Sequence, residues 1–301
     1  MLLLISGGVD STVVAGLLLA SLDPDNVHLM YIDTGLMREG ESAEVNRSLQ
    51  DLGALHLHIV YAGGEFLEAL RGVSDPEEKR KIIGDLFVDV QQREIAHAMP
   101  GDYFLAQGTL YTDMLESGKG VGSIAKVIKS HHNVRAPLIE AKRAAGRLIE
   151  PLSRLYKDEV RALGRLLRVP DEILRRHPFP GPGLAVRIIG EVTAERCEIL
   201  RAADAIFLAE LKERGLYDEI WQAFAVLLPV RSVGVTGDAR EYGWVVALRA
   251  IVSRDGMTAD VYPFKPSDLL EISSRITNEV PAVGRVVYDI SSKPPATIEW
   301  E

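Results

Sequence analysis

The first half of the chain alternates short apolar runs with patterns typical of helices, and this alternation restricts the fold more than any other feature. The apolar runs cover residues 2–5, 27–32, 55–60 and 103–106, and the helical patterns cover residues 12–22, 39–52, 76–90 and 157–167. Strands that alternate with helices pair in parallel, with helices on both faces of the sheet. The pattern therefore predicts an α/β fold with a doubly wound parallel sheet, whose ligands bind beyond the carboxyl ends of the strands.

Local signals refine this prediction. Asp75, Pro76 and Glu78 form a helix start in which the aspartate caps the first turn, and Gly53 marks the end of the second helix. From residue 109 to residue 134 the periodicity fails, and glycine occurs at positions 118, 120 and 122. A loop of this length inside a compact domain is usually a lid or a disordered segment, so we expect a lid here.

A segment rich in proline and glycine, residues 177–183, separates the two halves of the chain. Its three prolines and two glycines exclude both a helix and a central strand. We place the domain boundary here, with a first domain of residues 1–178 and a second domain of residues 179–301; the alternative is a simple linker. Beyond it we expect strands at 184–189, 223–230, 244–252 and 285–290 and helices at 193–214 and 267–279. Gly215 would end the first of these helices and Ser267 would cap the second, which predicts a smaller α+β domain.

The composition excludes several classes of protein. The chain carries 34 basic and 43 acidic side chains, a formal net charge of −9, which argues against a duplex nucleic acid partner held by a basic surface. Cys197 is the only cysteine, so an internal disulfide is excluded and a cytoplasmic location is favoured. We interpret this residue as a buried, inert thiol. No run of about 20 apolar residues occurs, so we expect no membrane span.

A short loop between the first strand and the first helix carries the strongest functional signal. It consists of Ser6, Gly7, Gly8, Val9, Asp10, Ser11 and Thr12. Main-chain N–H groups at a helix N-terminus attract anions, and the glycines let phosphate oxygens approach the backbone. A carboxylate beside phosphates requires a bridging cation, so Asp10 predicts a Mg²⁺ ligand; the alternative is a tight turn in which Asp10 caps the helix. The lysine and spacing of a P-loop are absent.

This loop resembles the pyrophosphate loop of the N-type ATP pyrophosphatases, which split ATP into AMP and pyrophosphate and adenylate a substrate oxygen. Among these enzymes, the chain resembles the synthetase portion of the GMP synthetases over nearly all of its residues. The matching segments, in the same order, are residues 27–38, 72–84, 105–109, 128–134, 176–184, 222–226 and 292–301. The resemblance implies a sheet of the N-type ATP pyrophosphatase (adenine nucleotide alpha hydrolase-like) type, followed by a smaller α+β dimerisation domain, and a homodimer.

The resemblance also implies a reaction. With ATP and Mg²⁺, the O2 atom of xanthosine 5′-monophosphate (XMP) is adenylated, and ammonia then displaces AMP to leave GMP. This is the last step of de novo guanine nucleotide synthesis, and the enzyme would be a carbon–nitrogen ligase. The protein's part in such a reaction is to position the reactants and stabilise charge.

The resemblance assigns one group of residues to ATP. The loop from Ser6 to Thr12 would hold pyrophosphate and its metal, Asp33 and Gly35 would line the adenosine pocket, and Gly108 would lie near the ribose. The expected catalytic residues are Asp10, Asp113, Glu116 and Lys129, with His131 as a further phosphate contact. The alternative for Asp113 and Glu116 is a pair of solvated lid carboxylates. Since adjacent residues of an extended chain point apart, His131 and His132 do not predict a zinc site.

A second group of residues is assigned to XMP. A rigid backbone edge would read the purine, cations and an amide would hold the phosphate or ribose, and the C-terminal segment would contact the base. These residues are Arg80, Pro180, Gly181, Gln222, Arg285, Lys293, Thr297, Ile298 and Glu299. For Arg285 and Lys293 the alternative is ordinary surface charge.

The chain departs from the family pattern at two points. Met1 begins almost on the first strand, where the family usually has a preceding helix. No segment resembles a glutaminase, which needs a cysteine on a tight turn with a histidine partner. We therefore expect ammonia to arrive free, from a separate glutamine amidotransferase chain, or from a domain that has been removed.

Two other functions compete with this interpretation. A tRNA thiolase would need catalytic or metal-binding cysteines and a basic surface, which one cysteine and a net charge of −9 oppose. A non-catalytic nucleotide-binding module would be expected to lose Asp10, Asp113, Glu116 or Lys129, and none of these is replaced.

Overall fold

The computed structural model describes residues 1–99, 101–116, 137–236, 239–254 and 256–301. The chain divides into two compact units. Unit 1 comprises Met1–Asp33, Gly40–Ala62 and Phe87–Arg176, and unit 2 comprises Thr34–Glu39, Gly63–Leu86 and His177–Glu301. The boundary between residues 178 and 179 stays a prediction.

A five-stranded parallel sheet lies at the centre of unit 1, in the order β3-β2-β1-β4-β5. Its strands are β1 (Leu2–Ile5), β2 (His28–Asp33), β3 (His56–Tyr61), β4 (Leu105–Ala106) and β5 (Leu148–Ile149). β2 and β3 lie on one side of β1, and β4 and β5 lie on the other. The carboxyl ends of β1 and β4 therefore flank the point where the strand order reverses, which is where parallel sheets bind ligands.

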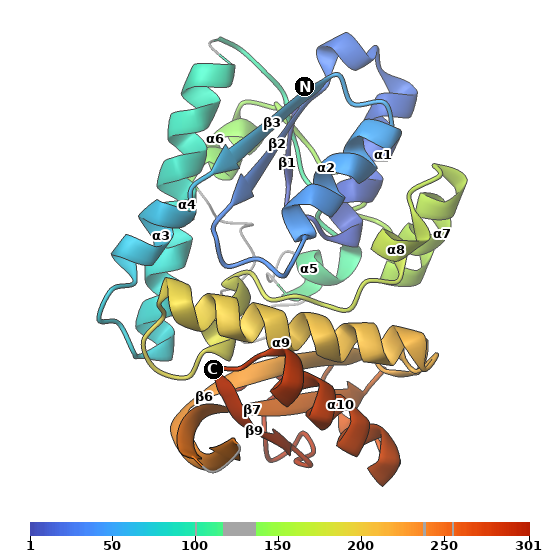
Figure 1. Ribbon diagram of the computed structural model, residues 1–301. Coiled ribbons are helices and arrows are strands. Elements are labelled where there is room, and N and C mark those ends of the chain that lie inside the picture. Colours follow the sequence, from blue (N-terminus) through green and yellow to red (C-terminus); the bar gives the residue numbers. More distant parts are fainter. Residues whose placement is uncertain (100, 117–136, 237–238, 255) are drawn as a thin grey trace. The chain divides into compact units, whose positions relative to one another are not determined.

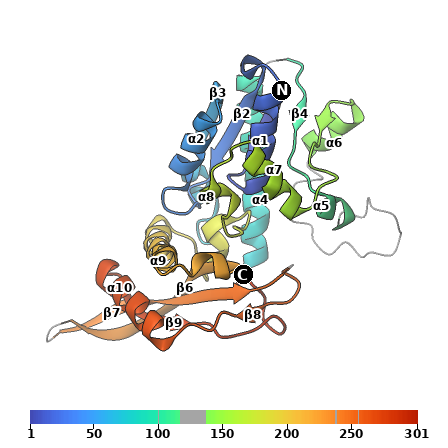
Figure 2. The ribbon, with the colours of Figure 1, turned by 90° about the vertical axis from the view of Figure 1, so that its right-hand side faces the viewer.

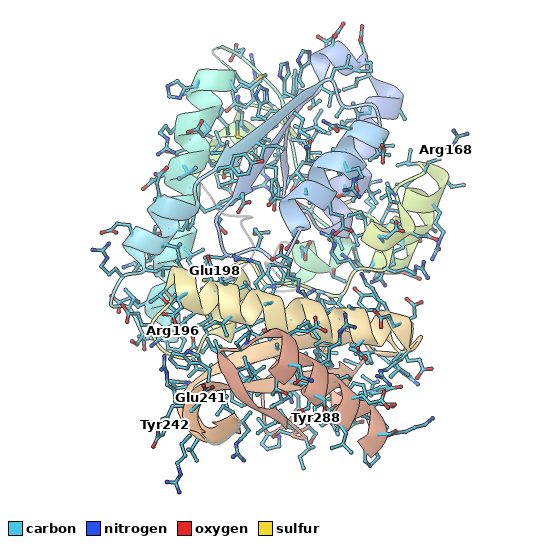
Figure 3. The ribbon with its side chains drawn as sticks, viewed as in Figure 1. Arg168, Arg196, Glu198, Glu241, Tyr242 and Tyr288 are labelled. Carbon is cyan, nitrogen blue, oxygen red and sulfur yellow. The ribbon has the colours of Figure 1, made fainter. Side chains whose placement is uncertain are left out.

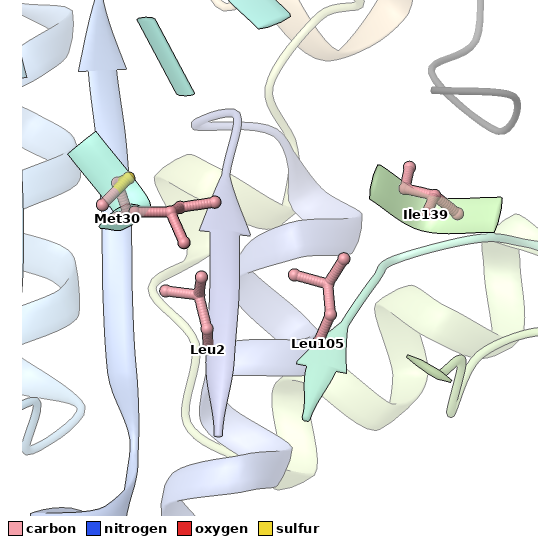
Figure 4. Close-up of a cluster of buried hydrophobic side chains, with 5 residues drawn as sticks. Leu2, Met30, Leu105 and Ile139 are labelled. Atoms are coloured by element: carbon pink, nitrogen blue, oxygen red, sulfur yellow. The ribbon is translucent and has the colours of Figure 1, made fainter. Parts of the chain in front are cut away.

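Helices cover both faces of this sheet (Figure 1). One face carries α1 (Val9–Ser21), which contacts α2 (Glu41–Asp51), α7 (Lys157–Leu166) and α8 (Asp171–Leu174). On the other face, Leu2, Met30 and Leu105 pack against Ile95 of α4 (Pro76–Ala98) and Ile139 of α6 (Pro137–Ala144), as Figure 4 shows for the strand and α6 side chains. Unit 1 also holds η1 (Pro24–Asn26) and α5 (Tyr111–Glu116). The predicted doubly wound parallel sheet is confirmed.

Unit 2 is built on a mixed four-stranded sheet with β7 (Ala239–Val252) at its centre. Two strands pair antiparallel with β7, namely β6 (Gln222–Thr236) and β8 (Asp260–Val261), and β9 (Val283–Tyr288) pairs parallel with it. Two long helices, α9 (Ala194–Glu213) and α10 (Pro266–Glu279), pack on this sheet and on each other (Figure 2). The shorter elements are α3 (Gly63–Ala69), η3 (Gly183–Arg187) and η4 (Tyr217–Glu219). The predicted smaller α+β unit is confirmed.

The local signals read from the sequence hold at most helix ends. The Asp75 carboxylate accepts a hydrogen bond from the N–H of Glu78 at 2.9 Å, so the predicted cap of α4 is confirmed. Gly53 and Gly215 adopt the left-handed φ that ends a helix. Beyond α7 the exposed Arg168 takes the same conformation, with φ 60°, and its side chain projects away from the unit (Figure 3). No helix among the described residues is long and apolar enough to cross a membrane.

Three expectations were wrong. The predicted strand at 184–189 is a 3₁₀ turn over Gly183–Arg187, because hydrogen bonds from Lys79 to Ala185 and from Leu184 to Leu36 hold these residues in the turn. Ser267 does not cap α10, which begins one residue earlier at Pro266, since proline is favoured in the first helical turn. The aperiodic stretch from residue 109 contains a short helix, α5, over Tyr111–Glu116; residues 117–134 of that stretch lie outside the described residues.

Candidate functional site

The parallel strands of unit 1 bring polar residues from distant parts of the sequence to one edge of the sheet. Ser6 follows β1, Asp33 ends β2, Gly108 follows β4 and Glu150 follows β5. Parallel strands present their carboxyl ends at the same edge. Of the predicted ATP-binding residues, those that the structure describes in unit 1 (residues 6–12, Asp33 and Gly108) therefore lie at this edge, around the switch point between β1 and β4.

The loop after β1 is folded by its own hydroxyl groups. The N–H groups of Ser6 and Gly8 donate to the Oγ atoms of Ser11 and Ser6 at 3.2 and 3.3 Å. The hydroxyls of Ser11 and Thr12 donate to the main-chain oxygen of Gly8 at 3.2 and 2.9 Å. Gly8 is the N-cap of α1 and supplies no side-chain acceptor. The alternative in which Asp10 caps this helix is therefore wrong, and the first turn keeps N–H groups for an anion.

Two cations from later in the chain hold this loop. Lys157, the first residue of α7, donates to both carboxylate oxygens of Asp10 at 2.7 Å. Arg176 donates to the main-chain oxygen of Gly7 at 2.7 Å and forms ion pairs with Glu41 and Glu44 of α2 at 3.3 and 2.7 Å. Neither residue was predicted from the sequence. A lysine in the first turn of a helix is unfavourable because it opposes the helix dipole. The position of Lys157 was therefore the one sequence signal that this residue has a partner elsewhere.

Gly108 lies against the start of α1 more closely than most side chains would allow. A Cβ atom at this position would lie 3.2 Å from the main-chain carbonyl carbon of Asp10 and 3.3 Å from the Ser11 nitrogen. Glycine is therefore the residue that lets the end of β4 approach the loop. The predicted place of Gly108 next to the bound nucleotide is compatible with this contact.

Asp33 is oriented by a short chain of hydroxyl groups. Ser42 of α2 donates to Oδ2 of Asp33 at 2.6 Å, and the Ser42 oxygen lies 3.2 Å from the hydroxyl oxygen of Tyr31. Tyr31 is 1% exposed, and burial raises the pKa of its hydroxyl, so this group stays protonated and can donate. Gly35, the other predicted adenosine contact, belongs to unit 2 and has φ 72°.

The predicted lid residues are only partly described. Oδ2 of Asp113 accepts a hydrogen bond from the N–H of Leu110 at 2.9 Å, which closes the first turn of α5. The backbone of Glu116 lies in the same helix, but its side chain is not among the described parts. Lys129, His131 and His132 lie outside the described residues. The roles predicted for these residues stay predictions.

The predicted XMP residues all lie in unit 2, and most of them already have partners there. Arg80 donates to the main-chain oxygen of Glu301, Lys293 to that of Gly256 at 2.7 Å, and Arg285 to the Ser232 hydroxyl at 3.2 Å. Pro180 and Gly181 lie in the irregular segment before η3. The other four, Gln222, Thr297, Ile298 and Glu299, belong to a hydrogen-bonded cluster around the last residues of the chain.

Three wholly buried cations hold this last segment, and none of them was predicted from the sequence. Arg249 donates to the main-chain oxygens of Thr297 and Ile298, both at 2.8 Å. Arg187 forms a two-pronged ion pair with the carboxylate of Glu299. Lys79 pairs with the carboxylate of Glu301, and burial lowers its pKa. Residues 297–301 are therefore fixed by side chains from α4, η3 and β7.

The chain was compared with known proteins. Residues 209–300 match the family described as the GMP synthase C terminal domain. The chain is 54% identical to the glutamine-hydrolyzing GMP synthase of Bdellovibrio bacteriovorus over 297 residues, which are 99% of this chain and 58% of that protein. It is 59% identical to the GMP synthase of Aquifex aeolicus (99% and 57%) and 52% identical to that of Saccharomyces cerevisiae (99% and 56%). The chain matches the synthetase portion of GMP synthases. It spans less than three fifths of the length of these relatives.

The chain also has a structural likeness to the NMN synthetase from Francisella tularensis. The TM-score is 0.43 at 16% sequence identity, over 60% of this chain and 67% of that chain.

Two further features of the chain bear on the predicted chemistry. The first is that the cysteine of this chain is unsuited to nucleophilic attack. Cys197 is 2% exposed in α9, and burial raises its pKa to about 11, so the thiol is protonated at neutral pH. The predicted burial of this cysteine is confirmed.

The second feature is the donor set for Mg²⁺. Among the residues that the structure describes, no three His, Cys, Asp or Glu side chains are grouped as metal ligands. Mg²⁺ is usually held by one or two carboxylates together with substrate phosphates. The single carboxylate of Asp10, next to a loop that favours anions, fits this requirement.

Proposed function

We propose that this chain catalyses the synthetase reaction of GMP formation. XMP is adenylated at O2 by ATP, pyrophosphate leaves, and ammonia displaces AMP to give GMP. The observation that carries the proposal is identity of 52–59% to GMP synthases over 99% of the chain. The phosphate-binding geometry between β1 and β4 supports it independently.

The loop of residues 6–12 would bind the β- and γ-phosphates of ATP. The N–H groups of the first turn of α1 have no side-chain cap and would donate to phosphate oxygens. Asp10 would hold Mg²⁺, which supplies positive charge to the phosphates when it is bound. Because Lys157 bonds to both Asp10 oxygens, it would have to give up at least one of them to the metal.

The remaining predicted residues would act around this centre. Asp33, Gly35 and Gly108 would contact the nucleoside, and Asp113, Glu116, Lys129 and His131 would act on the phosphates. Arg80, Gln222, Arg285, Lys293 and residues 297–299 would bind XMP, with Pro180 and Gly181 at the purine. We further propose a cytoplasmic homodimer that takes ammonia directly or from a glutamine amidotransferase.

The test is a reaction with purified chain, ATP, Mg²⁺, XMP and ammonium, in which GMP and pyrophosphate are both measured. The proposal requires the two products in equal amounts and no GMP when glutamine replaces ammonium without a partner chain. A folded chain that forms neither product would contradict it.

A matched pair of variants tests the site within this reaction. Asp10→Asn removes the charge of the predicted metal ligand and should lower kcat by about 100-fold or more, since electrostatic stabilisation of that size is typical at reacting phosphates. Asp89→Asn makes the same change on an exposed position of α4 in unit 1 and should leave kcat unchanged. Equal activity of the two variants would show that Asp10 is not a metal ligand in this reaction.

A further inference from the structure

Arg187 is a buried side chain that forms an ion pair with Glu299. It is 0% exposed, and its Nε and Nη2 atoms donate to Oε2 and Oε1 of Glu299 at 3.0 and 2.8 Å. Aromatic rings lie near the guanidinium, with the Phe224 and Phe179 ring centres 4.1 and 5.0 Å from its central carbon. This environment holds the arginine in one orientation.

The third nitrogen of the guanidinium, Nη1, makes no hydrogen bond to any described residue. This atom is buried, and among the described residues Glu299 is the one acidic partner of Arg187. Burial of two charges costs more solvation than a well-packed apolar pair would, so such a pair is poor evidence for a stabilising role. The ion pair instead holds the Glu299 carboxylate in a fixed position, and the Glu299 side chain is still 19% exposed.

The pair also sets the direction of a second hydrogen bond. Oε1 of Glu299 accepts from Nε2 of Gln222 at 2.7 Å. A carboxylate paired with arginine only accepts, so the Gln222 amide must turn its NH₂ group toward it. Glu299 therefore keeps only acceptor capacity, on Oε2, whereas Gln222 keeps its carbonyl oxygen as an acceptor and one N–H as a donor.

We propose that Arg187 is a positioning residue of the base-binding site, which fixes Glu299 as an acceptor for a purine edge that carries N–H donors. The inference rests on the proposed function, in which Glu299 contacts XMP. The xanthine ring has N–H groups at N1 and N3, on either side of the O2 atom that is adenylated. Hypoxanthine has a hydrogen at N1 but an acceptor at N3, so a Glu299 carboxylate that faces N3 would disfavour IMP.

The experiment measures steady-state kinetics and nucleotide binding for Arg187→Lys, Glu299→Gln and the double variant. Arg187→Lys keeps the charge but loses the two-pronged geometry. Each single variant should raise KM for XMP about tenfold, which is the expected loss for a charged hydrogen bond. KM for ATP should change by less than about twofold. The preference for XMP over IMP, measured by calorimetry, should fall by a similar factor. Arg214→Lys is the matched control, because Arg214 forms ion pairs with Glu210 and Glu271 elsewhere in unit 2.

The double variant separates positioning from general damage. If Arg187 acts through Glu299, the double variant is no worse than the worse single variant, because the second change removes nothing further. Equal rises in KM for XMP and ATP, or additive losses, would overturn the inference. If Arg187→Lys fails to fold, Glu299→Gln decides the question alone through its selectivity for XMP over IMP.

Failure of the proposed reaction gives a different pattern. A wild-type chain that forms no GMP contradicts the proposed function. Calorimetric binding of XMP that still depends on Arg187 and Glu299 would then support the inference by itself. Binding of XMP and IMP that is unchanged in both single variants would overturn the inference even where GMP is formed.

Discussion

Replacement of Gly183 by alanine should destabilise unit 2 by about 3 kcal/mol. Gly183 has φ 63°, and a Cβ atom there would lie 2.3 Å from the main-chain oxygen of Leu36. That oxygen accepts a hydrogen bond from the N–H of Leu184 at 2.8 Å. A left-handed conformation costs an L residue about 1–2 kcal/mol, and a displaced, buried hydrogen bond costs about 1–3 kcal/mol. The sum corresponds to roughly a 100-fold change in the folding equilibrium.

Two other glycines of unit 2 separate these contributions. Gly215 has φ 71°, but no atom lies within 4 Å of the position that an alanine Cβ would take, so Gly215→Ala should cost about 1 kcal/mol through backbone strain alone. Gly181 lies two residues before Gly183, with neither a left-handed φ nor an atom within 4 Å. Gly181→Ala should leave the stability within about 0.5 kcal/mol of the wild type.

Urea unfolding followed by tryptophan fluorescence measures this series directly, because Trp221, Trp244 and Trp300 all lie in unit 2. The expected order of destabilisation is Gly183→Ala, then Gly215→Ala, then Gly181→Ala. If Gly183→Ala costs no more than Gly215→Ala, the close approach to Leu36 contributes nothing and the reasoning is wrong. Equal losses for all three would show general intolerance of alanine.

Three further changes test other parts of the structure. Gly108→Ala should raise KM for ATP severalfold, with little effect on KM for XMP, because the added Cβ displaces the start of α1; equal effects on both constants would contradict this. Asp75→Ala should lower the free energy of unfolding by about 1 kcal/mol through loss of the helix cap, while Asp75→Asn keeps most of it. Burial lowers the pKa of His177 to about 4. Because the unfolded chain takes up this proton near pH 6.5 and the folded chain does not, unit 2 should lose about 3 kcal/mol as the pH falls from 6.5 to 4; urea titrations of His177→Gln should show less of this loss.

The alternation of strands and helices in the first half was predictable because each element carries its own local signal. The first two apolar runs stop near glycine or aspartate, and Asp75 and Gly53 mark the start and the end of two of the helices. The loop after β1 followed from the same logic, since its place between a strand and a helix determines where its N–H groups point. β5 has only two residues, Leu148 and Ile149, and a run that short has no period to detect.

The turn over Gly183–Arg187 was mistaken for a strand for a physical reason. Leu184, Ala185 and Val186 form an apolar run that suits a buried strand equally well. The choice is made by contacts with residues far away in the sequence. Lys79 donates to the main-chain oxygens of Ala185 and Ile188 at 3.2 and 2.7 Å, and the N–H of Leu184 is held by Leu36. None of these partners can be read from the local pattern.

The residues that were missed in the candidate site share this property and point to how the site is assembled. Asp10 and Lys157 are 147 positions apart, and Arg187 and Glu299 are 112 apart. Buried charges such as Arg187, Arg249 and Lys79 stabilise a fold less than apolar side chains of the same size would. Their common effect is to hold residues 297–301, where the resemblance places the contacts to the XMP base. A core built for stability alone would not need three buried cations around one short segment, and what the three share is that they fix the position of residues 297–301.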